Sequence, residues 1–248
     1  KDIARAWLAQ PTGRYPHGVF GDEVEAGTLV VETAAGAQHA YRLDDGSVFE
    51  DVSPRLADLD ADGRDEVWTM RSDFFAGARL EAYGLQDGKL VRQFAADPIG
   101  LGFRWLNPIG VADFDGDGVR EAAYVQTPHI GGIVTIVRAS GERLVRVARL
   151  SGYSNHAMGS PALDLSTVAD FNGDGSAEMI VPVDGRRQLA VLALKGGALV
   201  ERWRSARVAP VSAALRAVRA KGLWQVEYKT ASGAVVRVEL DRKSTRLN

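Results

Sequence analysis

An acidic, glycine-containing turn occurs three times in the chain with one spacing of oxygen-bearing side chains. The copies are residues 58–66 (DLDADGRDE), 113–121 (DFDGDGVRE) and 170–178 (DFNGDGSAE). Each has side-chain oxygens at positions 1, 3, 5 and 9, glycine at position 6, and a backbone carbonyl available at position 7. Alternate residues direct their oxygens inward around such a turn, and glycine permits the backbone conformation that closes it. Hard oxygen ligands in this number favour calcium over zinc or copper.

Acidic turns also occur without a metal, because Asp and Gly favour tight turns for reasons of their own. Three copies with identical ligand spacing make calcium binding the stronger prediction. An EF-hand would require a bidentate Glu at position 12 between two helices. Position 12 is Thr69, Tyr124 or Val181, and a strand-like run follows each loop. These are therefore not EF-hands.

The spacing of the loops along the chain predicts a repeat fold. They begin at Asp58, Asp113 and Asp170, so the period is 55 and then 57 residues. A constant period of this size indicates a solenoid, a propeller or an array. Each repeat contains four short strand-like runs separated by turn residues, as in a propeller blade. In the second and third repeats these runs span 109–112, 122–126, 132–138 and 143–150, and 167–169, 179–183, 188–194 and 199–203.

Two weaker units flank these repeats. Residues 28–50 resemble a blade that has lost its acidic ladder, and residues 213–240 supply three strands. Segment 2–8 has the pattern of an outer blade strand and is expected to complete the last blade, which would remove exposed sheet edges. The sequence therefore predicts an all-β fold: a five-bladed β-propeller of four-stranded antiparallel blades, closed by the N-terminal strand, in one domain over residues 1–240.

The three loops, each followed by a strand, resemble the FG-GAP/VCBS repeat family, the calcium-loop propellers to which integrin α-subunits belong. The likeness extends over residues 1–240, although the Phe-Gly…Gly-Ala-Pro signature of integrins is largely missing and Asn172 replaces an acidic ligand. The resemblance implies three calcium ligand sets, in which position 7 acts through its carbonyl oxygen. They are Asp58, Asp60, Asp62, Arg64 and Glu66; Asp113, Asp115, Asp117, Val119 and Glu121; and Asp170, Asn172, Asp174, Ser176 and Glu178.

Composition excludes several classes of partner. The net charge of −2 argues against nucleic acid, which favours a basic face. No apolar run approaches the ~18 residues of a membrane span. The chain has no cysteine, so neither disulfides nor thiol chemistry are available. Calcium loops of low affinity fill outside cells and stay empty in cytosol, so we expect a periplasmic or secreted protein.

Both ends of the chain are expected to differ from the natural protein. The first residue is Lys1 rather than methionine, as expected if a signal peptide is missing. The last eight residues, 241–248, resemble a translated sequencing adapter and are expected to be a non-native tail.

Catalytic motifs of the hydrolase-elbow, phosphate-loop and metalloprotease types do not occur. In a four-stranded blade the acidic loops join strands 1 and 2, and loops on the opposite face carry a second group of polar and aromatic residues. Arg, His, aromatic and Asn side chains there would suit an anionic or sugar-like ligand, or they could seal the contacts between blades. This group consists of Arg14, Tyr15, His17, Arg55, Arg104, Trp105, His129, Asn155 and His156.

Two functions from different classes remain open. The first is a calcium-stabilised module that binds a protein, carbohydrate or anionic ligand without chemistry, and the sequence favours it because no acid–base pair is visible. The second is a hydrolase or lyase that uses the His/Arg/Tyr group. A buried His within hydrogen-bond reach of a carboxylate would favour the second.

Overall fold

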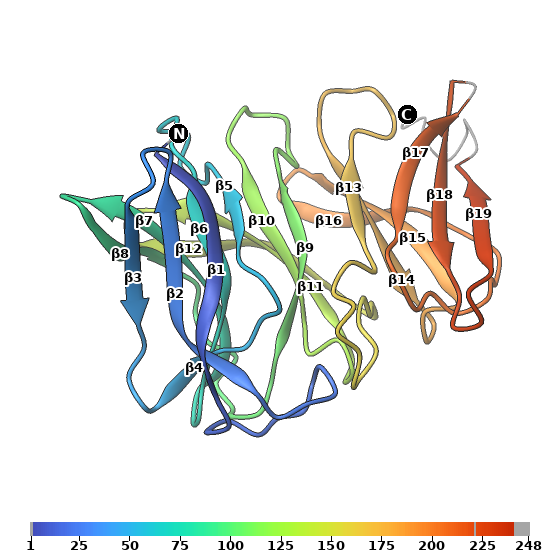
Figure 1. Cartoon of the computed structure of the whole chain (residues 1–248). Helices are drawn as coiled ribbons and strands as arrows, with labels where there is room; N and C mark the ends of the chain where they lie inside the picture. The colour runs from blue at the N-terminus through green and yellow to red at the C-terminus, as the bar shows by residue number, and fades with distance from the viewer. Residues whose placement is uncertain (1, 221, 241–248) are drawn as a thin grey trace. The chain divides into compact units, whose positions relative to one another are not determined.

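The computed structural model describes residues 2–220 and 222–240, which form strands and connecting loops with no helix among them. The predicted tail, 241–248, lies outside the described residues. The strands are labelled in Figure 1 and run in this order: β1 (Ile3–Thr12), β2 (Glu25–Thr33), β3 (Gln38–Arg42), β4 (Ser47–Phe49), β5 (Arg55–Ala57), β6 (Glu66–Asp73), β7 (Gly77–Gln86), β8 (Lys89–Ala95), β9 (Leu106–Ala112), β10 (Glu121–Gln126), β11 (Ile133–Ser140), β12 (Arg143–Ser151), β13 (Thr167–Ala169), β14 (Glu178–Val183), β15 (Gln188–Lys195), β16 (Ala198–Arg204), β17 (Arg216–Ala220), β18 (Leu223–Lys229) and β19 (Val235–Glu239).

The all-β prediction is confirmed, and four-stranded repeats follow the acidic turns. Strands β5 to β8 pair antiparallel in chain order, and β13 to β16 form a separate antiparallel sheet. The inner strands are more deeply buried than the outer ones: all six residues of β14 are buried, whereas Leu199 is the one buried residue of β16. Each acidic turn joins the first strand of a repeat to its second, as predicted.

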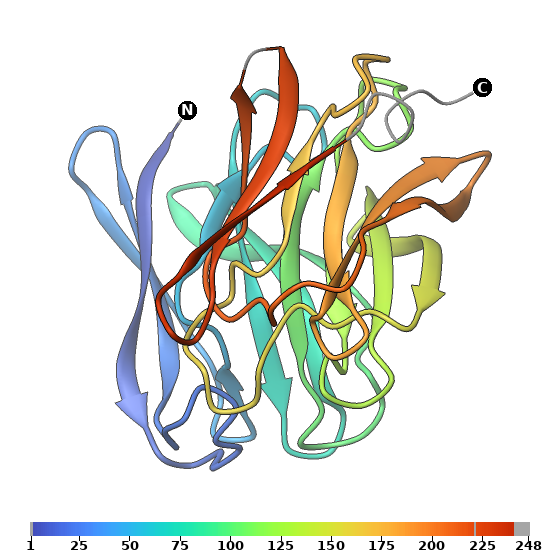
Figure 2. The same cartoon turned by 90° about the vertical axis from the view of Figure 1, so that its right-hand side faces the viewer.

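The predicted closure by the N-terminal strand is wrong. Strand β1 pairs antiparallel with β2 over nearly its whole length, from Ile3 opposite Thr33 to Thr12 opposite Glu25. The apolar side chains of segment 2–8 therefore pack with those of β2. Strands β17 to β19 form a three-stranded sheet of their own, shown in red in Figure 2. Pairing β1 with β2 closes a much shorter loop than pairing it with the last sheet, about 200 residues away. The shorter loop lowers the entropy cost of pairing.

The strands also do not divide into five separate sheets. One sheet has 12 strands, because β4 pairs with β6 and β12 meets β8 at a single bridge, Arg143 to Ala95. Within the described residues the strands form three sheets, of 12, 4 and 3 strands.

Two compact units each contain their own apolar core. Unit 1 runs to Leu106 and includes Val137–Arg146, and unit 2 comprises Asn107–Ile136 and the chain from Val147 onward. The core of unit 1 includes Leu29, Phe49 and Tyr83. Unit 2 has one cluster around Phe114 and a second around Phe171, both of which are acidic-loop residues.

Candidate metal centre

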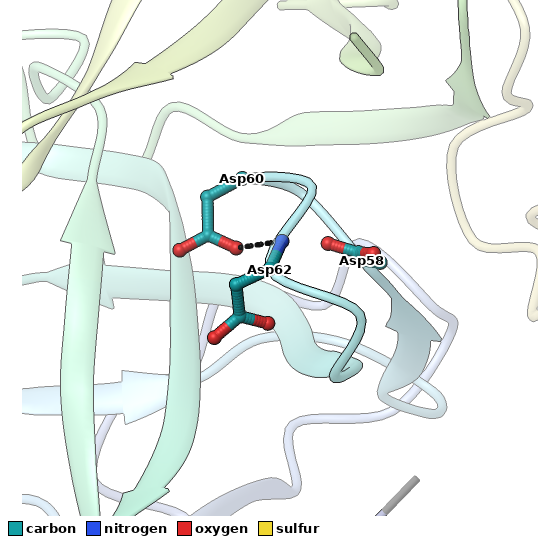
Figure 3. A group of neighbouring side chains, drawn as sticks. All are labelled: Asp58, Asp60 and Asp62. Atoms are coloured by element: carbon teal, nitrogen blue, oxygen red, sulfur yellow. Dashed lines mark hydrogen bonds between the residues drawn. The ribbon is translucent and has the colours of Figure 1, made fainter. Parts of the chain in front are cut away.

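The first acidic loop brings three carboxylates together. Asp58, Asp60 and Asp62 each offer an oxygen, and these atoms all lie within 4.8 Å of one another (Figure 3). The backbone N–H of Asp62 donates to Asp60 Oδ1 at 3.2 Å, and that of Gly63 donates to Asp58 Oδ2 at 3.1 Å. These bonds curl the turn so that alternate side chains face one point. Asp113, Asp115 and Glu121 form a second such group in the next loop.

A shared hydrogen-bond framework holds all three loops. The amide of position 2 donates to the Glu at position 9: Leu59 to Glu66 at 2.8 Å, Phe114 to Glu121 at 2.9 Å, and Phe171 to Glu178 at 2.9 Å. The Asp at position 1 accepts from the glycine amide at position 6 in every loop, at 2.8 to 3.1 Å. The loops are therefore structurally equivalent as well as alike in sequence.

Position 2 anchors each loop, and the ligand-based reading of the sequence did not single it out. Leu59, Phe114 and Phe171 are almost fully buried, and the two phenylalanines belong to the apolar clusters of unit 2. The signal was present, because an apolar residue stands between two acidic or amide residues in all three copies. Burial of this side chain fixes the acidic residues at the protein surface.

Burial and like charge act on the position-9 carboxyls. Desolvation, together with the neighbouring aspartates, raises the pKa of Glu66 to about 7 and that of Glu178 to about 7. Asp58 Oδ1 is buried without a hydrogen-bond partner, although its other oxygen is used by Gly63. Converging carboxylate oxygens, one of them buried without a donor, match the donor set of a hard divalent cation.

The third loop differs because it supplies its own positive and hydrogen-bonding groups. Asn172 Nδ2 donates to Asp174 Oδ2 at 3.1 Å and to Glu178 Oε1 at 2.6 Å. Lys195 Nζ lies 3.1 Å from Asp174 Oδ2, and its charge helps to lower the pKa of that carboxyl. In the first loop, Arg64 pairs with Asp62 at 2.7 Å. The third loop differs from the first in the amide of Asn172, which donates to two of its carboxylates.

Loops two and three are neighbours within unit 2. The backbone N–H of Ala177 donates to the carbonyl of Asp113 at 2.8 Å. A Cβ at Gly116 would lie 2.8 Å from Ser176 Oγ, so the serine side chain would have to turn away. The φ of 81° is the stronger reason for glycine at this position.

The second predicted group, of polar and aromatic residues, lies partly in unit 1. There its side chains form hydrogen bonds with other parts of the unit. Tyr15 is fully buried, stacks on Phe103 with ring centroids 4.6 Å apart, and accepts the Phe103 amide. Trp105 is also buried and donates Nε1–H to the carbonyl of Glu50 at 2.9 Å. Burial of these two aromatic residues fits the alternative that the group seals contacts within the protein.

The charged members in unit 1 have close partners as well. Arg55 pairs with Asp51 at 2.8 Å, and Arg104 donates to the carbonyl of Phe103 at 2.9 Å. Arg14 is held by the carbonyl of Ser47, with which Nη2 makes a bond of 2.6 Å.

The three members in unit 2 are close to one another. His129 Nε2 lies 2.7 Å from His156 Nδ1, and His156 Nε2 lies 2.7 Å from the carbonyl of Ser160. Asn155 donates to the carbonyl of Pro108 at 3.0 Å. Asn155 and His156 are fully buried, and burial lowers the pKa of His156 to about 4. Both residues fit the sealing alternative, because their polar atoms join segments of unit 2.

A histidine–glutamate pair that no sequence motif predicted lies in unit 1. His17 Nδ1 is 2.5 Å from Oε1 of Glu50, which is fully buried and also accepts from Ser72 Oγ. Glu25 is buried nearby, and desolvation together with the charge of Glu50 raises its pKa to about 9. Sequence reasoning missed both glutamates because each belongs to an ordinary strand end or strand exit.

No protein-family model matches the chain, and no curated protein matches its sequence. Among solved structures, the chain is similar to rhamnogalacturonan lyase YesW at 15% sequence identity and a TM-score of 0.49. The match covers 84% of this chain and 50% of the lyase chain, so the chain spans about half the length of that protein. At this level of similarity, neither residue roles nor an activity is transferred.

Among residues 2–220 and 222–240, none belongs to a helix that is long and apolar enough to cross a membrane.

Proposed function

We propose that the acidic loops bind calcium and that calcium stabilises this β-sheet repeat protein. The observation that carries the proposal is the convergence of Asp58, Asp60 and Asp62 on one point, repeated by Asp113, Asp115 and Glu121. Like charges at this separation repel, so the apo loops carry an electrostatic cost that a bound cation would remove.

The donor set fits calcium better than other common ions. All candidate side-chain ligands are oxygens, as calcium prefers, and neither His nor Cys is among them. Position 7 offers a backbone carbonyl (Arg64, Val119 or Ser176) to complete each set. Asp58 Oδ1, which is buried without a donor, is the kind of atom that a cation would satisfy. Bound calcium would neutralise the converging carboxylates and would link the start of each loop to its end.

The wider reading of the protein rests on this proposal. We place it with the FG-GAP/VCBS repeat propellers as a periplasmic or secreted module that binds a partner or ligand without chemistry. Three four-stranded repeats with equivalent loops support a propeller-type repeat, and calcium loops of low affinity suit an extracellular setting. A propeller-type arrangement of the repeats is part of the proposal, whereas closure by the N-terminal strand is not, because β1 pairs with β2.

Thermal unfolding in calcium and in EGTA tests the proposal. Binding to the native state alone adds about 2.7 kcal/mol per site at 100 times Kd, which for two sites corresponds to a rise in Tm on the order of 10 °C. Asp58→Asn combined with Asp113→Asn should abolish most of this rise. Asp97→Asn is a matched control, because Asp97 is an exposed acid paired with Arg143 away from the loops. An equal Tm in calcium and in EGTA would contradict the proposal.

A second candidate function, a hydrolase or lyase, is favoured by the His17–Glu50 pair. A buried carboxylate bonded to Nδ1 holds the imidazole with Nε2 directed away from it, which is the orientation a general base requires. We expect His17 to be the only histidine in unit 1 whose alkylation or carbethoxylation depends on Glu50. Chemical modification of wild type and Glu50→Gln tests this: equal rates at His17 in the two proteins would count against an activated imidazole.

A further inference from the structure

We propose that a polar hollow in unit 1 binds a small polyhydroxylated carboxylate, such as a sugar acid. The hollow has a volume of about 660 Å³ and lies where the ends of β1 and β3 meet β2. Its lining includes Gln10, Thr12, Arg14, Gly27, Arg42, Asp44 and Asp45. It is separate from the acidic loops, so it can bind its ligand whether or not those loops hold calcium.

An unusual backbone conformation opens the hollow. Gln10 has a φ of 56°, in the left-handed region that a residue with a side chain rarely adopts. The β1–β2 register places it between the Ala9–Thr28 and Pro11–Ala26 pairs, opposite Gly27. Because Gly27 has no side chain, bare backbone faces the space. Strain of this kind persists only when surrounding contacts hold it, and it concentrates at binding sites.

The polar groups around the hollow are fixed before any ligand arrives. Gln10 Oε1 accepts from Thr28 Oγ1 at 2.8 Å and from Arg42 Nε at 3.0 Å. Arg14 donates through Nε and Nη2 to the carbonyl of Ser47, at 3.0 and 2.6 Å. Groups held in this way lose little conformational freedom on binding, which favours affinity.

The charge balance of the hollow identifies the ligand's charged group. Two arginines and two aspartates line the hollow. Arg14 pairs with Asp45, with Nη1 and Oδ1 3.2 Å apart, and Asp44 Oδ2 lies 3.9 Å from Nη2 of Arg71, outside the lining. Arg42 lies on β3 opposite Thr28 of β2, and within the described residues the hydrogen-bond partner of its guanidinium is the neutral amide of Gln10. Its two Nη groups are therefore available as a planar pair of donors, the geometry that matches a carboxylate.

The remaining groups suit hydroxyls. Asp44 and Asp45 are exposed carboxylates that accept hydrogen bonds, and Gln10 also carries an amide that can donate. Such alternation of donors and acceptors around one hollow matches a molecule whose hydroxyls both donate and accept. A guanidinium beside these groups adds a preference for a carboxylate on the same molecule.

Calorimetry with glucuronate and glucose tests the proposal, since the two sugars differ at one carboxylate. Protein and sugar are dialysed to the same free calcium concentration. We expect glucuronate to bind and glucose to bind at least about tenfold more weakly, as for loss of a charge-assisted hydrogen bond. Arg42→Gln should weaken glucuronate about tenfold and leave glucose unchanged.

Gly27→Ala tests the position of the ligand. An added methyl would lie 3.5 Å from Arg14 Nη2 and from the Gln10 carbonyl, which is ordinary contact, so the fold should tolerate it while the hollow shrinks. Binding should fall, with the Tm changed by little. Arg5→Gln is the control, because Arg5 is an exposed arginine of β1 paired with Glu32 outside the hollow.

Absence of glucuronate binding, or binding that Arg42→Gln and Gly27→Ala both leave intact, would overturn the proposal. Glucose binding as tight as glucuronate would overturn the assignment of Arg42 to a carboxylate. The calcium-dependent Tm, measured on the same samples, reports separately on the acidic loops.

Discussion

Leu59 donates its backbone N–H to Glu66 Oε2 at 2.8 Å, and this bond ties the start of the first acidic loop to the strand that follows it. Phe114 and Phe171 make the same bond to Glu121 and Glu178. One oxygen of the position-9 glutamate therefore closes the loop. We propose that the residue has a second function, in which its charge helps to bind calcium.

Replacing Glu66 should separate these two functions. Glu66→Ala strands the buried Leu59 amide and should lower the free energy of unfolding by about 1–3 kcal/mol even in EGTA. Glu66→Gln keeps an acceptor for that amide and should cost much less in EGTA, yet it should weaken calcium binding. Urea unfolding of both variants checks the first effect, and calcium titration checks the second. Equal losses for the two variants in EGTA would show that the hydrogen bond does not hold the loop.

Ala61 should be a strained position. Its φ is 62°, whereas the equivalent residues are Gly116 and Gly173, both with a φ of 81°. A left-handed conformation costs a residue with a side chain about 1–2 kcal/mol, partly offset by the greater freedom of glycine when unfolded. Ala61→Gly should therefore raise the free energy of unfolding by up to about 1 kcal/mol. Denaturant unfolding of this variant beside Ala34→Gly, an exposed loop control, measures the difference; a loss of stability would contradict the strain.

The third loop should bind calcium more weakly than the first two. Asn172 removes one ligand charge, and Lys195 competes for Asp174. Asn172→Asp with Lys195→Met should strengthen binding at this loop, because it restores four carboxylates and removes the competing ammonium. Calorimetry that detects no tighter or additional site in the double variant would refute this account of the loop.

Glu25 should make the protein less stable as pH rises. Its pKa is raised from 4.5 to about 9, so between these values the folded state holds a proton that the unfolded state has released. The contribution of protonated Glu25 to stability is fully present below about pH 4.5. As the pH rises from about 4.5 to about 9, the free energy of unfolding falls by up to about 1.4 kcal/mol per pH unit. The carboxyls responsible besides burial are those of Glu50, Asp22 and Asp51.

Glu25→Gln should flatten this dependence, since the amide cannot ionise. Unfolding measured from pH 5 to pH 9 in saturating calcium compares the two proteins, with Glu23→Gln as an exposed control on the same segment. Parallel pH profiles for wild type and Glu25→Gln would mean that Glu25 does not govern this range.

Local patterns in the sequence were sufficient to predict most strands. Segment 167–169 matches β13 in both bounds and segment 188–194 matches β15 to within one residue, because turn residues delimit short apolar runs on either side. The acidic loops were equally readable, since ligand spacing within nine residues is a local property. The pairing of β1 was not: its apolar pattern fits the edge of any sheet, and only the tertiary structure shows that β2 is its partner.

The second group of site residues shows the same limit. Tyr15, Trp105, Asn155 and His156 are residue types that serve binding sites and interiors alike, and sequence position alone did not reveal their burial. The partners that fix them, such as the Glu50 carbonyl for Trp105, come from segments about 50 residues away. Burial of a polar side chain depends on such distant partners.

Counting bound calcium by equilibrium dialysis tests the central claim most directly. The account predicts two sites of higher affinity, at residues 58–66 and 113–121, and a weaker third at 170–178. Asp58→Asn should remove one of the stronger sites and Asp113→Asn the other, while Asp97→Asn should leave the count unchanged. If wild type binds no more calcium than the variant that combines Asp58→Asn and Asp113→Asn, the acidic loops are solvated turns and the proposed function is wrong.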